Sequence, residues 1–234
     1  MFDQRAIREK ERMDLPDFNR DLAERSFRFI HFVNRFLGGT RIVRSYLKRE
    51  RQRLRLVRPL RILDIGAGDC DIPITIAREH HGPGTPPHFY CVERCPYATA
   101  IARRNIAAQT LENVTVVNKD IFEHTPEGRY DVGIASMVMH HLDDEEIREL
   151  LRRLRGLVRY SVLVNDLRRS GACYLGGRML TLLAKADVQH DVLLSIRKGF
   201  TRKELTALMS AADAKLMTIN HRLFGRVTAE LRFE

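Results

Sequence analysis

A glycine loop next to acidic residues is the first stretch of this chain that could do chemistry. In LDIGAGDCDIP, residues 63–73, an apolar run ends at Asp64, and Gly66, Ala67 and Gly68 follow it. Glycines at such a place leave backbone amides uncovered beside the start of a helix, where the positive end of the helix dipole favours a polar or anionic ligand. The stretch therefore predicts a strand-to-helix loop that holds the polar part of a cofactor.

The residue after this loop argues against a dinucleotide. The dinucleotide fingerprint has a third glycine three residues after the second, where the helix packs closely over a pyrophosphate. That position is Asp71, and its carboxylate would repel a diphosphate. The Gly-Lys-Ser/Thr of a phosphate loop is also missing from the sequence. A nucleoside without phosphate removes the conflict.

Two further acids stand where a nucleoside needs them. Glu93 ends the apolar run FYCVE, and Asp120 ends VVNKD. Carboxylates accept hydrogen bonds, so an acid after the second strand can bind both ribose hydroxyls and one after the third can meet the adenine amine. A tight turn without a ligand would explain the glycines but not these two acids.

The elements around these residues alternate between strand and helix. Five short apolar runs predict strands, at 61–65, 88–92, 114–118, 131–136 and 161–165. Helices are predicted at 71–79, 96–109, 143–155 and 201–212. Two β-rich segments, 214–220 and 223–231, predict a final antiparallel hairpin. This order is typical of the α/β class with a doubly wound, mostly parallel, seven-stranded sheet.

Two segments lie outside the minimal α/β pattern. Residues 1–58 predict a helical prefix or cap, because apolar residues recur at helical spacing from Leu22 to Leu37 and a second helical segment follows at 41–55. Residues 59–234 form the α/β domain, and its stretch 170–200 predicts a partly helical insertion that acts as a lid.

Four motifs occur in a fixed order over roughly residues 60–165: LDIGAG, VERC, KDIF and DVGIASMVMHHL. Together they resemble the class I S-adenosylmethionine-dependent methyltransferases, which implies a Rossmann-like methyltransferase fold and S-adenosylmethionine as the cofactor. The resemblance places Asp64, Gly66, Ala67 and Gly68 around the methionine moiety, Glu93 with Arg94 at the ribose, Asp120 with Ile121 at the adenine, and Ser136 beside the cofactor after the fourth strand. Cys70 departs from the family pattern, since many members have glycine there.

Histidines supply the candidate catalytic groups. His140 and His141 follow the fourth strand, and MHHLDDEE is similar to the His-Asp-Trp-x-Asp segment of plant small-molecule O-methyltransferases, which implies His140 as general base. A purely structural role for His140 stays open. His190, next to Asp191 in the insertion, is the second candidate base. No set of His, Cys, Asp and Glu has metal-ligand spacing in the sequence, so no metal is predicted.

A looser resemblance concerns the acceptor. The segments PDFNRDLAERSFRFIHFVNRFLGG and HDVLLSIRKGFT look like a bacterial subgroup that methylates aromatic polyketide, phenol or quinone-like rings. We therefore expect a small-molecule methyltransferase, O-directed, acting on a small aromatic acceptor in secondary metabolism. The aromatic side chains of the prefix would then roof the acceptor or simply pack the helix: Phe27, Phe29, Phe32 and Phe36.

The charge distribution supports one alternative. The net charge is +10, and residues 1–60 hold sixteen Lys/Arg against eight Asp/Glu. The basic run at 41–58 could meet phosphates, an acidic membrane surface or only solvent, so an RNA-modifying methyltransferase is the alternative. Nucleic acid is the less favoured partner, because the sequence lacks both an Asn/Asp-Pro-Pro-Tyr/Phe tetrad and a correctly placed Pro-Cys nucleophile.

Cysteine spacing and hydropathy bear on the cellular compartment. The four cysteines form no Cys-x-x-Cys pair, which predicts reduced thiols. No stretch approaches the ~18 consecutive apolar residues of a membrane span. The sequence thus predicts a cytoplasmic protein without a transmembrane segment, and it leaves a homodimer open.

Overall fold

The computed structural model describes residues 2, 4–12, 15, 20–79 and 86–234. The predicted prefix is therefore described except for residues 1, 3, 13–14 and 16–19. Within the described residues, no helix is both long and apolar enough to cross a membrane.

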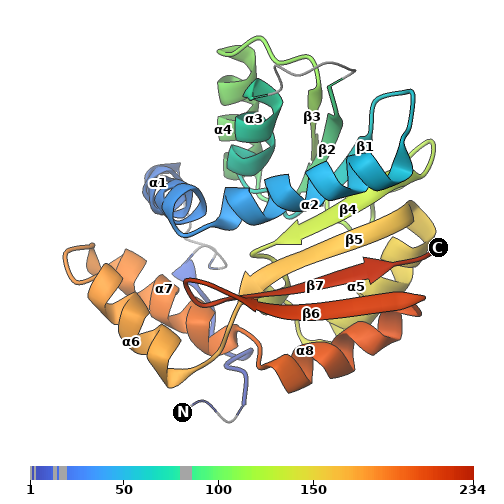
Figure 1. Ribbon diagram of the computed structural model, residues 1–234. Helices are drawn as coiled ribbons and strands as arrows, with labels where there is room; N and C mark the ends of the chain where they lie inside the picture. Colours follow the sequence, from blue (N-terminus) through green and yellow to red (C-terminus); the bar gives the residue numbers. More distant parts are fainter. Residues whose placement is uncertain (1, 3, 13–14, 16–19, 80–85) are drawn as a thin grey trace.

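A seven-stranded sheet forms the centre of the fold (Figure 1). Its strands are β1 (Arg61–Ile65), β2 (His88–Glu93), β3 (Val114–Asn118), β4 (Tyr130–Ser136), β5 (Val158–Leu167), β6 (Leu216–Arg222) and β7 (Arg226–Arg232). The order is β3-β2-β1-β4-β5-β7-β6. The first five strands are parallel, and β7 runs antiparallel to both of its neighbours. The predicted doubly wound, mostly parallel sheet is confirmed.

Eight α-helices connect or precede the strands in the described residues. They are α1 (Arg20–Phe36), α2 (Gly39–Leu54), α3 (Asp71–Arg78), α4 (Pro96–Ala107), α5 (Asp144–Leu157), α6 (Gly171–Leu180), α7 (Ala186–Lys198) and α8 (Arg202–Met209). Short 3-10 turns, η2 (Met139–His141) and η3 (Ser210–Ala212), follow β4 and α8. Capping boxes begin two of the helices, with Asp143 before α5 and Thr201 before α8, because each side chain accepts a hydrogen bond from the third helical amide.

Strand β5 is longer than the sequence predicted. It begins at Val158, directly after α5, and it pairs with β7 as far as Leu167. The polar residues Asn165 and Asp166 lie inside this strand, and both side chains are buried. Asn165 Nδ2 donates to Ser136 Oγ of β4 and Asp166 pairs with His140 in the turn after β4, whereas Asn165 Oδ1 has no hydrogen-bond partner within the described residues. The hydrogen bonds that are made offset part of the cost of burying polar residues inside a strand.

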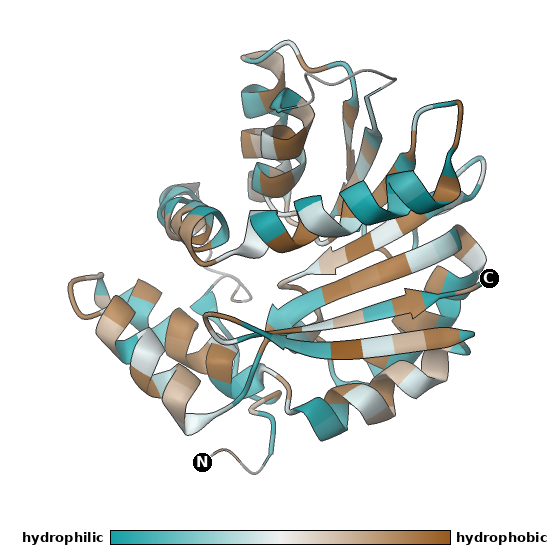
Figure 2. Cartoon of the chain, viewed as in Figure 1, coloured by the Kyte–Doolittle hydropathy of each residue, from teal (hydrophilic) through white to brown (hydrophobic). Residues whose placement is uncertain are grey.

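Apolar layers cover both faces of the sheet (Figure 2). Helices α5 and α8 pack on one face, and α2, α3 and α4 pack on the other. Helix α2 belongs to this core, since Val43, Tyr46 and Leu47 are buried against the strands. We therefore propose that the capping role expected of residues 1–58 falls on α1 and the segment before it.

A buried polar chain fixes α2 on β5. The Tyr46 hydroxyl lies 2.8 Å from Ser161 Oγ, and Ser161 donates to Glu50 Oε2 at 2.6 Å. Burial raises the pKa of Tyr46 well above its ordinary value, so the phenol stays protonated and donates to Ser161. Arg53, one turn along α2, pairs with Glu50 and balances its charge.

Helix α1 lies across the carboxyl edge of the sheet. Ala23 and Phe27 bury their side chains with Ala98 and Ile101 of α4. Polar contacts tie the rest of α1 to the start of α3: His31 Nε2 lies 2.6 Å from Asp69 Oδ2, and Asn34 Nδ2 donates to Asp71 Oδ2 at 3.4 Å. Phe27 and Asn34 thus stand directly over the glycine loop.

We expect the docking of α1 to depend on pH through His31. The hydrogen bond to Asp69 raises the pKa of His31 above its ordinary value, against the opposing effect of burial. Protonated His31 therefore stabilises the fold below the pKa of the unfolded chain, about 6.5, and this contribution is lost as the pH rises through the higher folded pKa. Urea unfolding should show His31→Gln less stable than the wild type by up to about 1 kcal/mol below pH 6.5. The difference should shrink toward pH 9, and a difference that stays constant with pH would contradict the assignment.

Candidate active site

A cavity of about 1080 Å³ opens at the carboxyl ends of the parallel strands. Ligands of open α/β sheets bind at this edge, where the strand order reverses between β1 and β4. All of the residues predicted to bind the cofactor line this one cavity: Asp64, Gly66, Ala67, Gly68, Glu93, Arg94, Asp120, Ile121 and Ser136. The structure therefore brings together side chains that are spread over more than seventy positions of the sequence.

The glycine loop leaves no room for side chains. Gly66 and Gly68 both have positive φ angles, +59° and +56°. A Cβ on Gly66 would overlap Val138, and one on Gly68 would lie 3.1 Å from a ring carbon of Phe27. Cys70 also takes a left-handed conformation, with φ of +63°, which explains why glycine is the easier residue at this position.

Glu93 is held in place by backbone amides. Its Oε2 accepts a hydrogen bond from Gly68 N at 2.9 Å, and its Oε1 accepts one from Cys95 N at 2.7 Å. A carboxylate has about four lone-pair sites, so two remain for ligand hydroxyls. Asp120 is fixed in a similar way, since its Oδ1 accepts from Phe122 N at 2.9 Å.

The wall of the cavity near the glycine loop is rich in acids. Burial, and then the charge of Glu93, raise the pKa of Asp64 to about 8. Burial likewise raises the pKa of Asp71. A bound pyrophosphate would disfavour ionisation of these carboxyl groups still further, whereas a nearby cation would favour their ionised form. This end of the cavity fits a ligand that carries a positive charge and no phosphate.

His140 forms a buried dyad with Asp166. The ring Nδ1 lies 2.7 Å from Asp166 Oδ1, and the His140 amide donates to Oδ2 of the same carboxylate at 3.2 Å. Burial alone would raise the pKa of Asp166, but the charge and hydrogen bond of His140 and the amide of Leu167 hold it below its ordinary value. The ionised carboxylate can only accept a hydrogen bond, so Nδ1 of His140 carries a hydrogen, and Nε2 is the nitrogen that can gain or lose the second proton.

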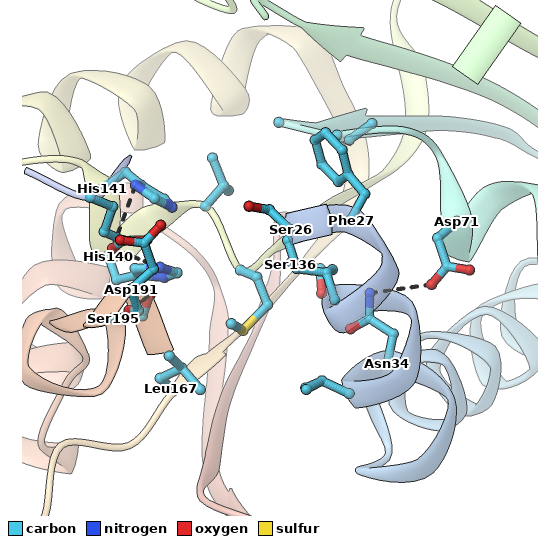
Figure 3. Close-up of a pocket in the computed structure, with 18 of the residues that line it drawn as sticks. Ser26, Phe27, Asn34, Asp71, Ser136, His140, His141, Leu167, Asp191 and Ser195 are labelled. Carbon is cyan, nitrogen blue, oxygen red and sulfur yellow. Dashed lines mark hydrogen bonds and ion pairs between the residues drawn. The ribbon is translucent and has the colours of Figure 1, made fainter. Parts of the chain in front are cut away.

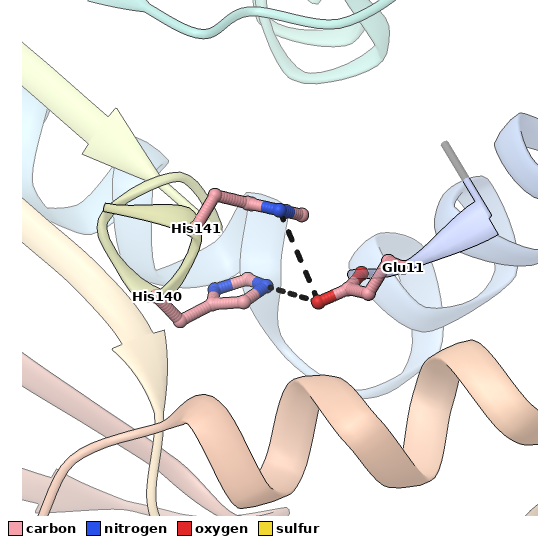
Figure 4. A group of neighbouring side chains, drawn as sticks. All are labelled: Glu11, His140 and His141. Carbon is pink, nitrogen blue, oxygen red and sulfur yellow. Dashed lines mark ion pairs between the residues drawn. The ribbon is translucent and has the colours of Figure 1, made fainter. Parts of the chain in front are cut away.

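The N-terminal segment adds a carboxylate to this site that the sequence analysis missed. Glu11 is 2% exposed, and its Oε1 lies 3.8 Å from His140 Nε2 and 3.9 Å from His141 Nδ1 (Figure 4). These three side chains have the ligand atoms of a metal site, within 4.8 Å of one another. The ammonium group of Lys198, however, lies 3.3 Å from the same Glu11 oxygen and supplies the positive charge there.

His190 lies apart from this group. Its side chain is 58% exposed on α7 and is absent from the residues that line the cavity. Its neighbour Asp191 does line the cavity and accepts a hydrogen bond from the Arg12 amide at 2.9 Å. Figure 3 shows Asp191 and Ser195 of α7 beside His140, on the other side of the cavity from α1. Asp191 therefore joins the insertion to the N-terminal segment. The two residues of this contact are 179 positions apart, so no local sequence pattern predicts it.

Only part of the expected aromatic roof faces the cavity. Phe27 and Phe29 line it together with Ile30 and Val33. Phe32 and Phe36 are exposed and contact each other with tilted rings, 5.1 Å between the ring centroids. At 100° per residue, Phe32 and Phe36 turn away from the face that carries Phe27 and Ile30, so the expectation was wrong for these two side chains.

Comparisons with known proteins agree with this geometry. Residues 62–160 match a protein-family profile described as a methyltransferase domain. Together with the fold and the cavity described above, this match identifies a methyltransferase domain of the class I fold in the chain. No curated protein matches the chain in sequence.

Solved structures resemble the chain at low sequence identity. The plantazolicin methyltransferase BpumL, solved with a monoazolic desmethylPZN analog and SAH, has a TM-score of 0.70 at 16% identity over 92% of this chain and 95% of its own. Magnesium protoporphyrin IX methyltransferase (ChlM) from Synechocystis PCC 6803, solved with SAH, has a TM-score of 0.59 at 13% identity over 84% of this chain and 82% of its own. A putative O-methyltransferase from Nostoc punctiforme PCC 73102 has a TM-score of 0.59 at 16% identity over 83% of this chain, which spans 55% of that protein's length. These likenesses show a common fold.

We expect Asp64 to destabilise the free protein as the pH rises. The folded pKa of about 8 lies far above the ordinary value of 3.8, so the folded chain binds more protons than the unfolded chain between these values. Urea unfolding measures the free energy of unfolding of Asp64→Asn and of the wild type. The difference between them should shift in favour of Asp64→Asn by roughly 2–4 kcal/mol as the pH rises from 5 to 8, and it should not change further above about pH 9. Glu127 is exposed, so Glu127→Gln serves as the control. Its free energy of unfolding should differ from that of the wild type by the same amount at every pH. A pH-independent effect of Asp64→Asn would show that Asp64 is ionised throughout.

Proposed function

We propose that this methyltransferase transfers the methyl group of S-adenosylmethionine to an oxygen of a small aromatic acceptor, such as a phenol or a quinone-like ring. Bound cofactor supplies an electrophilic methyl group on a sulfonium centre. The observation that carries the proposal is the dyad of Asp166 with His140, which lines a largely apolar cavity; Figure 3 shows His140 in this cavity. A role in secondary metabolism, which the sequence analysis expected, follows only if the acceptor is such an aromatic compound.

In this proposal the acid-rich end of the cavity holds the cofactor. The two free acceptor sites of Glu93 bind the ribose hydroxyls, with Arg94 at the rim, and Asp120 and Ile121 hold the adenine. The backbone of the loop Gly66–Gly68 and the hydroxyl of Ser136 border the methionine part. The loop amides are not uncovered as the sequence suggested, because those of Gly66 and Ala67 donate to Val92 O and that of Gly68 donates to Glu93. Asp64 faces the positive end of the cofactor, where a cation lowers the cost of its ionisation.

The acceptor occupies the other end of the cavity, under α1 and against α7. Aromatic and aliphatic side chains from both helices line it, including Phe27, Phe29, Val33, Val192 and Ile196. A cavity of about 1080 Å³ is at the upper end of the range for small-molecule sites, roughly 300–1,000 Å³, so cofactor and acceptor fit together. We propose that the insertion 170–200 and residues 2–12 close over this end as a lid and cap.

His140 then removes the proton from the acceptor hydroxyl. Asp166 fixes the ring so that Nε2 is the basic nitrogen, and it balances the positive charge that the ring gains. Bound S-adenosylmethionine would supply the methyl group: its carbon–sulfur bond would break as the oxygen–carbon bond forms, and the sulfur would keep the electron pair and leave as SAH. The cavity walls would align the acceptor oxygen with the methyl carbon. Glu11, opposite Nε2, must leave room for the acceptor oxygen.

Ion pairs within the protein count against the RNA-modifying alternative. Four of the eight basic residues in the run 41–58 pair with acids of this chain: Arg44 with Glu79, Arg49 with Glu230, Arg53 with Glu50 and Arg58 with Asp131. Much of the basic run therefore serves the fold, and the charge available for phosphates is correspondingly smaller.

We expect Glu93→Ala to weaken binding of SAH by roughly 1–3 kcal/mol, about 5- to 150-fold in Kd, because a charge-assisted acceptor of two hydroxyls is lost. Calorimetry measures this. Glu93→Gln should lose less, since it keeps one acceptor oxygen, and the exposed Glu79→Ala should bind as the wild type does. NAD bound more tightly than SAH, or unchanged SAH affinity in Glu93→Ala, would exclude this site.

We expect His140→Ala to lose about 10²–10⁴-fold in turnover of a phenolic acceptor, with SAH affinity unchanged. Asp166→Asn should also lower turnover, because the His140 ring is then no longer held in the tautomer with the hydrogen on Nδ1. For an acceptor that is already ionised, the loss of turnover in His140→Ala should be smaller, since no proton has to be removed. His190→Ala serves as control and should keep wild-type turnover. If His190→Ala is impaired and His140→Ala is not, the proton goes to α7; if neither matters, alignment alone carries the reaction.

A further inference from the structure

Helix α6 and the turn after it carry an apolar stripe on their outer side. Leu175, Met179, Leu182 and Leu183 follow one another at the spacing of one helix face, and all four are exposed, Leu182 at 71% and Leu183 at 98%. The inner side of α6 packs on α7 through Gly177, where a side chain would meet Ile196. The exposed stripe is therefore not the side of α6 that packs against the rest of the protein, because the opposite side packs on α7.

Two neighbouring segments extend this apolar surface. The turn between β6 and β7 exposes Leu223 and Phe224, and the end of α1 exposes Phe32 and Phe36. Figure 1 shows α1, the β6–β7 turn and the α6–α7 pair on the same side of the molecule. We call these eight residues the apolar rim: Phe32, Phe36, Leu175, Met179, Leu182, Leu183, Leu223 and Phe224.

Contacts in the structure confirm that the three segments adjoin. A Cβ on Gly225, in the β6–β7 turn, would lie 3.0 Å from Cys173 Sγ of α6. On the other side of the turn, Arg226 Nη2 donates to Asn34 Oδ1 of α1 at 3.1 Å. The turn thus bridges α1 and α6, so the three segments that carry the rim residues are neighbours in the fold.

The cavity opens within this rim. Leu180 and Phe224 are both exposed and both line the cavity. A surface that covered the rim would therefore face the mouth of the proposed acceptor site.

Basic residues alone accompany the stripe. From Arg168 to Ala186 the sequence has four basic residues and no acidic one. Arg168, Arg178 and Lys185 are exposed. The next acid, Asp187, pairs with Arg25 of α1 at 3.5 Å. The charge around the stripe is thus positive.

We propose that the apolar rim docks on the surface of an anionic lipid bilayer and sets the cavity mouth against it. Leucine and phenylalanine side chains enter the acyl boundary, while arginine and lysine reach the lipid phosphates. A second copy of the chain fits less well, because a twofold dimer brings like surfaces together and would set basic residues against basic residues over the cavity mouth. The proposal goes beyond methyl transfer and holds for any acceptor.

Sedimentation with vesicles tests the proposal on the intact 234-residue chain. Vesicles of phosphatidylglycerol mixed with phosphatidylcholine should bind the wild type, vesicles of phosphatidylcholine alone should bind it much less, and added salt should weaken the binding. Leu182→Ser/Leu183→Ser should lower the partition coefficient at least about tenfold, since two apolar side chains no longer enter the bilayer. Arg178→Glu/Lys185→Glu should lower it by a similar factor and remove most of the salt dependence.

Matched controls lie on other faces of the chain. Val57, 98% exposed, precedes β1 at the opposite edge of the sheet from the cavity, and Lys48 is exposed on α2. Val57→Ser and Lys48→Glu should bind vesicles as the wild type does, and unchanged SAH affinity checks the folding of every variant. The proposal is overturned if the wild type does not sediment with anionic vesicles, or if rim and control variants lose binding equally. It is also overturned if Leu182→Ser/Leu183→Ser only converts a dimer to a monomer.

Discussion

The carboxylate of Glu93 is the contact on which the cofactor end of the site depends. It joins the loop after β1 to the loop after β2, because one oxygen accepts from Gly68 N and the other from Cys95 N. Both loops would otherwise have unpaired amides at the edge of a buried sheet, and an unpaired buried amide costs about 1–3 kcal/mol. The same two bonds fix the carboxylate where a ribose would lie, so the fold and the site require the same residue.

The acids around the glycine loop set a second constraint. Asp64, Asp69 and Asp71 lie within eight positions of the sequence, and all three line the same end of the cavity. Their mutual repulsion is reduced by groups from α1, where His31 meets Asp69 and Asn34 meets Asp71. Helix α1 therefore does more than cover apolar surface, because it also supplies the hydrogen-bond donors that make this acidic loop stable without a ligand.

Residues at strand ends could be predicted from the sequence because a parallel sheet brings the carboxyl ends of its strands to one edge. The bounds of β1 and β3 follow from local patterns of apolar runs and turn residues. The residues assigned to the cofactor followed from the resemblance to class I methyltransferases, and the structure places all of them along one cavity. Glu11 could not be predicted in this way. It reaches His140 across more than a hundred positions, through a segment without regular periodicity, and only tertiary packing decides such a contact.

Strand β5 holds the proposed base and one cofactor-side residue in a fixed relation. Asn165 donates to Ser136 Oγ at 2.9 Å, and its carbonyl accepts from the Met137 amide. The next residue, Asp166, orients His140. In the proposed reaction these two bonds would set how far the methyl donor lies from the basic nitrogen, because neighbouring strands keep a spacing of about 4.8 Å. A misplacement of about 1 Å is enough to cost a hundredfold in rate, so we propose that the buried polar pair inside β5 aligns the donor with the base. This role would account for two polar residues directly after the apolar run Val162–Val164 of the same strand.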